Sequence, residues 1–471
     1  MTMLQNRNLA RAERPARAAS FAGRAIALVT ACSLLATQVQ AQTPVMRGPP
    51  TIRDTEIEQL LRDYARPILK AANLSKQNID IVIVNNANFN AFVADGRRIF
   101  INHGALLDSK TPNQVIGVLA HETGHIAGGH LSRLRERLAQ AQTQSIIAML
   151  LGIGAMVAGA RAGMNVGAPA ISAPQEAIRR NLLAYQRSHE EQADRAGVKF
   201  LDATGQSSKG MYETFKRLGD QSLFQTQGAD PYAMSHPMPQ DRVAALGDLA
   251  RTSPNWNKAD DPALQLRHDM MRAKISGFME RTDTVARRYP MSDSSLPARY
   301  ARAIAGYRHG DPRSALAQID ALIQVQPNNP YFYELRGQAL LEGGRPQEAI
   351  APLRKAMQLS HNAPLIQMLL GQALVATNNP AYAEEAITSL RNALSREPEA
   401  PMGFTQLSMA YARKGDLAQA DLASAQSSWL RGDFKTARDL ASRAKTRFPI
   451  GSPGWVKADD IVSTKQPGST P

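Results

Sequence analysis

The sequence has almost no cysteine and no long hydrophobic run. Its one cysteine, Cys32, lies in an N-terminal segment that we expect to be removed, so the mature chain would have no disulfide, no thiolate metal ligand and no cysteine nucleophile. No stretch of 18 or more apolar residues occurs, which excludes a polytopic membrane protein. Of the 471 residues, 20% are charged and 43% hydrophobic, a globular composition that excludes a disordered chain.

Residues 1–41 have the features of an export signal. An arginine-rich start precedes an apolar run over residues 25–36 and a small-x-small cleavage site at residues 39–41. The mature chain is therefore expected to begin near Gln42. The apolar run is too short for a membrane anchor. Lipidation at Cys32 is the alternative, although the apolar core continues beyond it.

Acidic residues are fewer than basic ones, 41 against 55, which gives a formal charge of +14. Residues 1–41 contain five arginines and one glutamate, so their removal leaves +10. We expect an exported, periplasmic protein, in which nucleic acid is not a partner and anionic lipid head groups are plausible ones. Solubility alone would also explain the excess.

The first half of the mature chain mixes helices with a few strands. Helical spacing covers residues 54–73, and β-branched or alternating runs predict strands at 79–84, 89–94 and 97–102. The last two strands are joined by Asp95-Gly96, which is a two-residue hairpin signal. The pattern thus predicts a small sheet.

A strongly signalled helix begins after this sheet. Thr111 can cap it, Pro112 suits its first position, and Gln114 completes a T-x-x-Q capping box, so we expect a helix to about Gln142. Residues 145–160 are apolar but interrupted by glycine. They predict a buried or lid helix, or a segment that inserts shallowly into a membrane surface.

A further helix is expected over residues 181–203, and the turn-rich stretch 252–262 indicates a domain boundary. Beyond it the sequence repeats with a period of 34, as Gly337 and Gly371 show, and three extra residues later shift the frame. Such helix-turn-helix units resemble tetratricopeptide repeats, which stack into an α-solenoid that binds other proteins. Near the end, turn signals only 17 residues apart, at Gly415 and Gly432, predict one helix shared by two hairpins.

The capped helix carries a metal-binding pattern. His121 and His125 are about 40° apart around a helix axis, so both imidazoles can converge on one ion. Glu122 is rotated away from this pair and can reach a water molecule beside the ion. In this H-E-x-x-H arrangement zinc lowers the pKa of water to about 7 and the glutamate takes the proton.

A third zinc ligand is required, because catalytic zinc normally has three protein ligands and one open position. The metzincin pattern fails, since His130 misses the required position by one residue, and we interpret it as a helix-surface residue or a support for a ligand. Glu190 shares the small, inward face of its helix, whereas Glu191 aligns with arginines and has the features of a solvated residue. Glu190 is therefore the expected third ligand, and Asp194, one turn later, could hold a ligand histidine by its other ring nitrogen.

These motifs resemble the HtpX-type zinc peptidase family, and within it the group of periplasmic β-barrel assembly-enhancing proteases that carry C-terminal tetratricopeptide repeats. The resemblance covers essentially the whole mature chain. It is carried by Asn90-Ala91-Phe92, residues 100–104, the zinc motif, Glu190 to Asp194, Ser235-His236-Pro237 and the repeats.

The resemblance implies that His121, His125 and Glu190 bind zinc, that Glu122 is the general base, and that His236 lies at the cleft. It also implies that the partners are unfolded or misassembled outer-membrane proteins and the β-barrel assembly machinery. Contact of 145–160 with a membrane surface is instead an expectation from the apolar composition of that segment. A neutral His236 could occupy the fourth zinc position as a latch, or it could assist the chemistry by stabilising the oxyanion. It could also simply cap the following helix.

The expected architecture is mainly α with a small β-sheet: a signal peptide at 1–41, a zincin-like metalloprotease domain at 42–255 and a tetratricopeptide-repeat solenoid at 256–471. The expected function is a zinc endopeptidase for envelope protein quality control, with a repeat-based chaperone or adaptor as the alternative. We further expect the strand 97–102 to form the wall of the cleft and to pair with substrate backbone, unless it is an ordinary buried strand.

Overall fold

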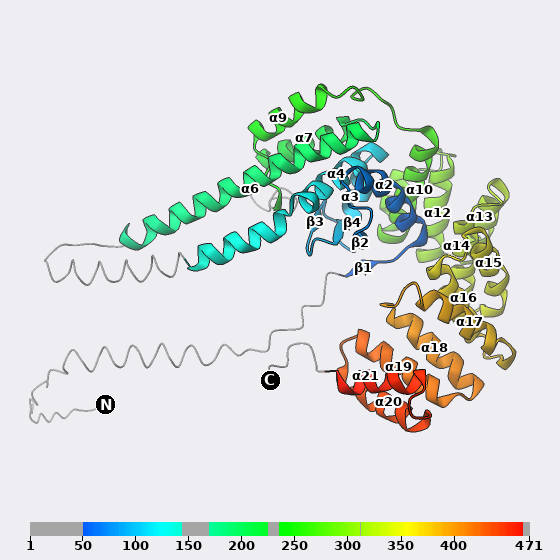
Figure 1. The fold of residues 1–471 in the computed structure, drawn as a ribbon. Helices are drawn as coiled ribbons and strands as arrows, with labels where there is room; N and C mark the ends of the chain where they lie inside the picture. The colour runs from blue at the N-terminus through cyan, green and yellow to red at the C-terminus, as the bar shows by residue number, and fades with distance from the viewer. Residues whose placement is uncertain (1–49, 144–168, 225–234, 311, 465–471) are drawn as a thin grey trace, which may run out of the picture. The chain divides into compact units, whose positions relative to one another are not determined.

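The computed structural model describes residues 50–143, 169–224, 235–310 and 312–464 (Figure 1). The predicted export signal at 1–41 and the apolar stretch 145–160 lie outside these ranges. Among the helices within them, none combines the length and the apolar character that crossing a membrane requires.

A small mixed sheet precedes the helix that carries the metal-binding motif. Its strands lie in the order β1-β2-β4-β3, with β2 and β4 parallel and the two outer strands antiparallel to their neighbours. The predicted Asp95-Gly96 hairpin is confirmed: Gly96 has a φ of 77°, and the Asp95 carboxylate accepts from the backbone N–H groups of Arg97 and Arg98. The strands are β1 (Thr51–Ile52), β2 (Asp80–Val84), β3 (Ala91–Val93) and β4 (Arg98–Asn102).

The position of β4 contradicts one prediction. The strand 97–102 cannot form the open wall of a cleft, because β4 lies between β2 and β3 and its backbone is paired on both sides. The strand at that edge of the sheet is β3 instead. Sequence spacing identified both strands of the hairpin but not which of them lies at the edge.

Helices pack around this sheet and around α4, which is at the centre of the first core. The largest buried side chains there include Tyr64, Phe215, Leu60 and Ile99, each at most 2% exposed. The helices are α2 (Thr55–Ala71), α3 (His103–Asp108), α4 (Pro112–Gly128), α6 (Pro169–Ala203), α7 (Lys209–Phe224) and α9 (Gln240–Arg251).

The helix expected over residues 111–142 is two helices. Its start is as predicted, because the Thr111 hydroxyl accepts from the backbone N–H of Gln114. The second bond of the capping box differs: the side-chain oxygen of Gln114 accepts from the backbone N–H of Lys110 instead of that of Thr111. Helix α4 then ends at Gly128, because Gly129 adopts a left-handed conformation with a φ of 63°, and a second helix covers residues 130–143. Glycine favours such a turn because it has no Cβ to clash.

Helix α10 (Pro262–Met279) contacts α2 and α3 as well as α12. Residues 252–261, which include the turns that predicted a domain boundary, connect it to α9. The boundary at 255 and 256 stays a prediction. After α10 the chain continues through α11 (Thr282–Arg288) into a series of helical hairpins.

The hairpins confirm the 34-residue repeat. A Cβ on Gly337 would lie 2.4 Å from Leu353, and one on Gly371 would lie 2.5 Å from Leu390, so both glycines let paired helices approach closely. The helix α19 packs against both α18 and α20, as the shared-helix prediction requires. The repeat helices are α12 (Leu296–His309), α13 (Pro312–Val325), α14 (Pro330–Glu342), α15 (Pro346–Leu359), α16 (Pro364–Ala376), α17 (Ala383–Leu394), α18 (Pro401–Lys414), α19 (Leu417–Leu430), α20 (Phe434–Arg447) and α21 (Pro453–Ser463), with a short turn η1 (Pro380–Tyr382) before α17.

Candidate metal centre

The motif on α4 is buried against α6. His121 and Glu122 are 0% exposed. The two helices cross closely at Gly124, where a Cβ would lie 2.8 Å from the carbonyl oxygen of Ala193. This contact places Glu190, about one turn before Ala193, beside the two histidines of α4.

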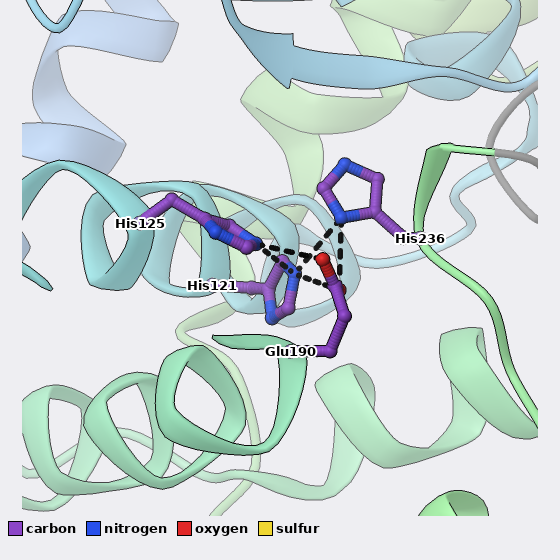
Figure 2. Close-up of side chains that lie close together, drawn as sticks. All are labelled: His121, His125, Glu190 and His236. Atoms are coloured by element: carbon purple, nitrogen blue, oxygen red, sulfur yellow. Dashed lines mark hydrogen bonds and ion pairs between the residues drawn. The ribbon is translucent and has the colours of Figure 1, made fainter. Parts of the chain in front are cut away.

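Four side chains converge at this crossing (Figure 2). His121, His125, Glu190 and His236 each offer one ligand atom, and these atoms all lie within 4.8 Å of one another. The Nε2 atoms of His121 and His125 are 3.0 Å apart. The Glu190 carboxylate lies 3.3 Å from the first and 3.5 Å from the second.

His236 approaches from the segment before α9. Its Nδ1 is 3.0 Å from Glu190 Oε2 and 3.4 Å from His121 Nε2. Its Nε2 is 3.5 Å from Glu122 Oε1. The structure therefore brings all the predicted site residues together, with His236 between the ligand candidates and the candidate base.

The two neighbouring glutamates of α6 differ in burial, as their positions around the helix predicted. Glu190 is 5% exposed, whereas Glu191 is exposed to solvent. Asp194 lies one turn further, with Oδ1 2.9 Å from His121 Nδ1, so it contacts the ring nitrogen that faces away from the cluster.

Arg242 on α9 was not identified from the sequence. Its Nε and Nη2 donate to the two oxygens of Asp194 at 2.7 and 2.9 Å, and its Nη1 donates to the carbonyl of Pro237 at 2.8 Å. Nη1 also lies 3.0 Å from Glu190 Oε2. No sequence pattern relates a residue of α9 to one of α6. The sequence indicates only that a buried Asp194 needs a cation beside it.

The charges of the cluster favour a cation. Burial raises the pKa of Glu122, whereas His236 and His121 overcome burial and hold the pKa of Glu190 well below its usual range. Burial alone would lower the pKa of His121, but Asp194 and Glu190 raise it to about 9. Burial lowers the pKa of His125 to about 3, so this imidazole is neutral and able to bind a metal.

These residues fit a divalent metal ion. Among the described residues at the site, the buried carboxylates are Glu122, Glu190 and Asp194, and Arg242 is the permanent cation beside them. Imidazole nitrogens and a carboxylate oxygen are the ligands typical of a catalytic zinc. Neither oxygen of Glu122 has a hydrogen-bond partner in the described part of the chain, although both are buried.

Comparisons with known proteins match the two halves of the chain to different families. Peptidase family M48 matches residues 51–250, and a tetratricopeptide repeat matches residues 300–364. A Yersinia pestis protein named Beta-barrel assembly-enhancing protease is 26% identical over 410 residues, which are 86% of this chain and 82% of that protein.

Two relatives from Escherichia coli (strain K12) are similar over shorter ranges. Another Beta-barrel assembly-enhancing protease is 24% identical over 302 residues, 62% of this chain, and the alignment spans 59% of that relative. A protein named Metalloprotease YcaL is 26% identical over 191 residues, 39% of this chain and 69% of that protein. The comparisons therefore show a peptidase family M48 domain at residues 51–250 with tetratricopeptide repeats after it, and the relatives are named as a protease or a metalloprotease.

Proposed function

We propose that this chain is a zinc endopeptidase that hydrolyses unfolded polypeptides. The convergence of His121, His125 and Glu190 beside the buried carboxylate of Glu122 carries the proposal, because a protein that only binds others does not need a base next to a metal site. When bound, zinc would act as a Lewis acid and lower the pKa of water to about 7.

The chain's own residues divide the remaining work. Glu122 accepts the proton of the attacking water, and its buried, weakly acidic carboxyl group is suited to passing that proton on to the leaving amine. Asp194 holds His121 through Nδ1, and Arg242 holds Asp194 in turn. This scaffold keeps the donor atoms in place while substrate binds.

Purified protein tests the proposal directly. It should cleave an unfolded protein, lose that activity to a chelator and regain it when zinc is added back. Absence of cleavage by both the zinc-loaded parent and a zinc-loaded His236→Ala variant would argue for the chaperone or adaptor alternative.

The ligand assignment makes the first prediction. Glu190→Gln should weaken zinc binding by more than the roughly 10- to 100-fold typical of losing a residue that only supports a ligand. Glu191→Gln should bind zinc like the parent, because its side chain faces solvent. Zinc content after dialysis, with a competitive chelator titration, measures both. Loss of zinc from Glu191→Gln alone would contradict the assignment.

The edge strand β3 is the proposed binding site for substrate backbone. The backbone N–H of Asn102 donates to the carbonyl of Asn90, so residue 90 faces β4. Because backbone groups alternate along a strand, those of Ala91 and Val93 point away from β4, toward the edge that no other strand of the described residues covers. An extended polypeptide could pair there with little regard for its sequence, close to α4, which contacts β3.

Proline at position 93 provides the second prediction. Val93→Pro removes an outward N–H and should lower kcat/KM for an unfolded substrate by about 3- to 10-fold, since one hydrogen bond contributes about 1 kcal/mol. Val93→Ala keeps the N–H and is the matched control. Proline is tolerated at a sheet edge. Equal kcat/KM values for the two variants, both with full zinc content, would rule out backbone pairing at this residue.

His236 is proposed to latch the resting site. Its Nδ1 lies among the ligand atoms and its Nε2 faces Glu122, so its ring occupies the place where water and substrate must meet the base. The contact of Arg242 with Pro237 fixes the segment that carries this histidine. Substrate would then have to displace His236 before cleavage.

Removal of the latch gives the third prediction. His236→Ala should raise basal cleavage of an unfolded substrate by about 5- to 30-fold. This factor corresponds to a free-energy cost of about one to two kcal/mol for displacing His236. His309→Ala, an exposed histidine on α12, should leave the rate unchanged. A rate below that of the parent, in a His236→Ala protein that retains zinc, would instead favour a role in stabilising the oxyanion.

We further propose that the protein acts in the periplasm on misassembled outer-membrane proteins and contacts the β-barrel assembly machinery. The names of the relatives, the repeat region and the predicted signal at 1–41 support this. Capture of bound proteins by a Glu122→Gln variant, with their identification by mass spectrometry, tests it. Recovery of only soluble periplasmic proteins would contradict it.

A further inference from the structure

A fourth histidine lies directly behind the cluster. His130 is 4% exposed, and its Nδ1 is 3.0 Å from Nδ1 of His125. Nε2 of His125 is the nitrogen that faces the other ligand atoms. The two nitrogens of His125 are thus divided between the cluster and His130.

We propose that His130 is a positioning residue for the metal ligand His125. To bind a metal, Nε2 of His125 must be unprotonated, so the proton of the neutral ring lies on Nδ1. That N–H donates to Nδ1 of His130, which fixes both the tautomer and the orientation of the ligand ring. On the other histidine of the motif, Asp194 likewise lies beside the ring nitrogen that faces away from the cluster, 2.9 Å from Nδ1 of His121. The inference rests on the metal site proposed above.

The break after α4 creates this contact. In an uninterrupted helix His130 would lie about 140° around the axis from His125 and could not meet it. Gly129, with its left-handed φ of 63°, redirects the chain so that the ring folds back. Gly128 provides the space, because a Cβ at this position would lie 2.2 Å from Nε2 of His130. Two adjacent glycines therefore serve the placement of one imidazole.

Helix α6 fixes the plane of the His130 ring. The ring of His189 stacks on it with centroids 4.4 Å apart and an angle of 4° between the planes. Tyr185 packs edge-on against His189 at 4.1 Å, and the guanidinium of Arg137 lies over Tyr185. His189 directly precedes Glu190, so one turn of α6 supplies a ligand candidate and the platform that orients the support of another.

Zinc affinity of the full chain tests the inference without a measurement of activity. His130→Leu removes the acceptor, His130→Asn retains one near the position of Nδ1, and Gly128→Ala keeps the histidine but displaces its ring. We expect the leucine and alanine variants to bind zinc about 10- to 100-fold more weakly than the parent, the usual cost of losing such a contact. The asparagine variant should stay close to the parent. A competitive chelator titration of the metal-free proteins measures all four.

The outcomes separate a positioning role from simple packing. If His130→Leu binds zinc like the parent, or if His130→Asn is as weak as His130→Leu, the inference is overturned. If the leucine variant does not fold, the other two variants decide. The inference then requires Gly128→Ala to bind zinc more weakly than His130→Asn, and equal affinities overturn it. A parent chain that binds no zinc would overturn the metal site itself, whereas a parent that binds and variants that do not differ overturn only the role of His130.

Discussion

A Glu122→Gln variant is expected to lose about 10²- to 10⁴-fold in the cleavage of an unfolded substrate while it still binds zinc like the parent. The range is the usual contribution of a positioned general base. Zinc binding should survive because the ligand atoms come from His121, His125, Glu190 and His236, and the Glu122 carboxylate is not among them. The side chains of Glu and Gln have nearly the same shape, so the packing of α4 is preserved.

The same variant should be as stable as the parent or more so. Both oxygens of Glu122 are buried without a hydrogen-bond partner among the described residues, and such a carboxylate is costly to the folded state. Kinetics on zinc-loaded protein and a denaturation curve test the two expectations together. Cleavage within about tenfold of the parent rate would mean that Glu122 is not the base.

The centre of the site could be predicted because its residues follow helical geometry. The spacing of His121 and His125 on a capped helix places both on one face. The choice of Glu190 over Glu191 depended on which face of α6 was small and apolar, and burial confirms that face. Local periodicity carries this information, so no knowledge of the tertiary structure was needed.

The surroundings of the site depend on long-range packing, which periodicity does not report. Arg242 meets Asp194 only because α9 packs against α6. His130 meets His125 only because Gly129 ends the helix one residue before it. A glycine inside an apolar, helical pattern can be tolerated or can end the helix, and the pattern alone does not distinguish the two. The edge position of β3 likewise follows from the strand order, which a hairpin signal leaves undetermined.

A buried ionic cluster at the start of the repeats was also invisible in the sequence. Lys274 on α10 lies 2.8 Å from Asp54, which caps α2, and 3.3 Å from Glu56. It also lies 3.8 Å from Glu334 on α14, and Tyr300 on α12 donates to Glu56 at 3.0 Å. The cluster thus connects the first helix of the peptidase domain with the first helices of the repeats.

Replacing Lys274 with methionine is expected to lower the free energy of unfolding by about 3 to 5 kcal/mol near pH 8, the typical effect of removing one partner from a buried ion pair. Methionine fills a similar volume, but it leaves the carboxylates of Asp54, Glu56 and Glu334 facing one another. Lys216→Met is the matched control, because this lysine on α7 is exposed and should change the free energy by at most about 0.5 kcal/mol.

The effect of Lys274→Met should depend on pH in a defined direction. Burial raises the pKa of Glu334 from 4.5 to about 7, although Lys274 opposes this. Between these values the folded chain keeps a proton that the unfolded chain has lost, so the contribution of Glu334 to stability falls as the pH rises through this window. Without the ammonium group the pKa of Glu334 rises further and the loss extends above pH 7. The difference between parent and variant should therefore widen from pH 5 to pH 8. Urea denaturation at both pH values measures it, and an equal difference, or a larger one at pH 5, would show that Lys274 does not neutralise these carboxylates.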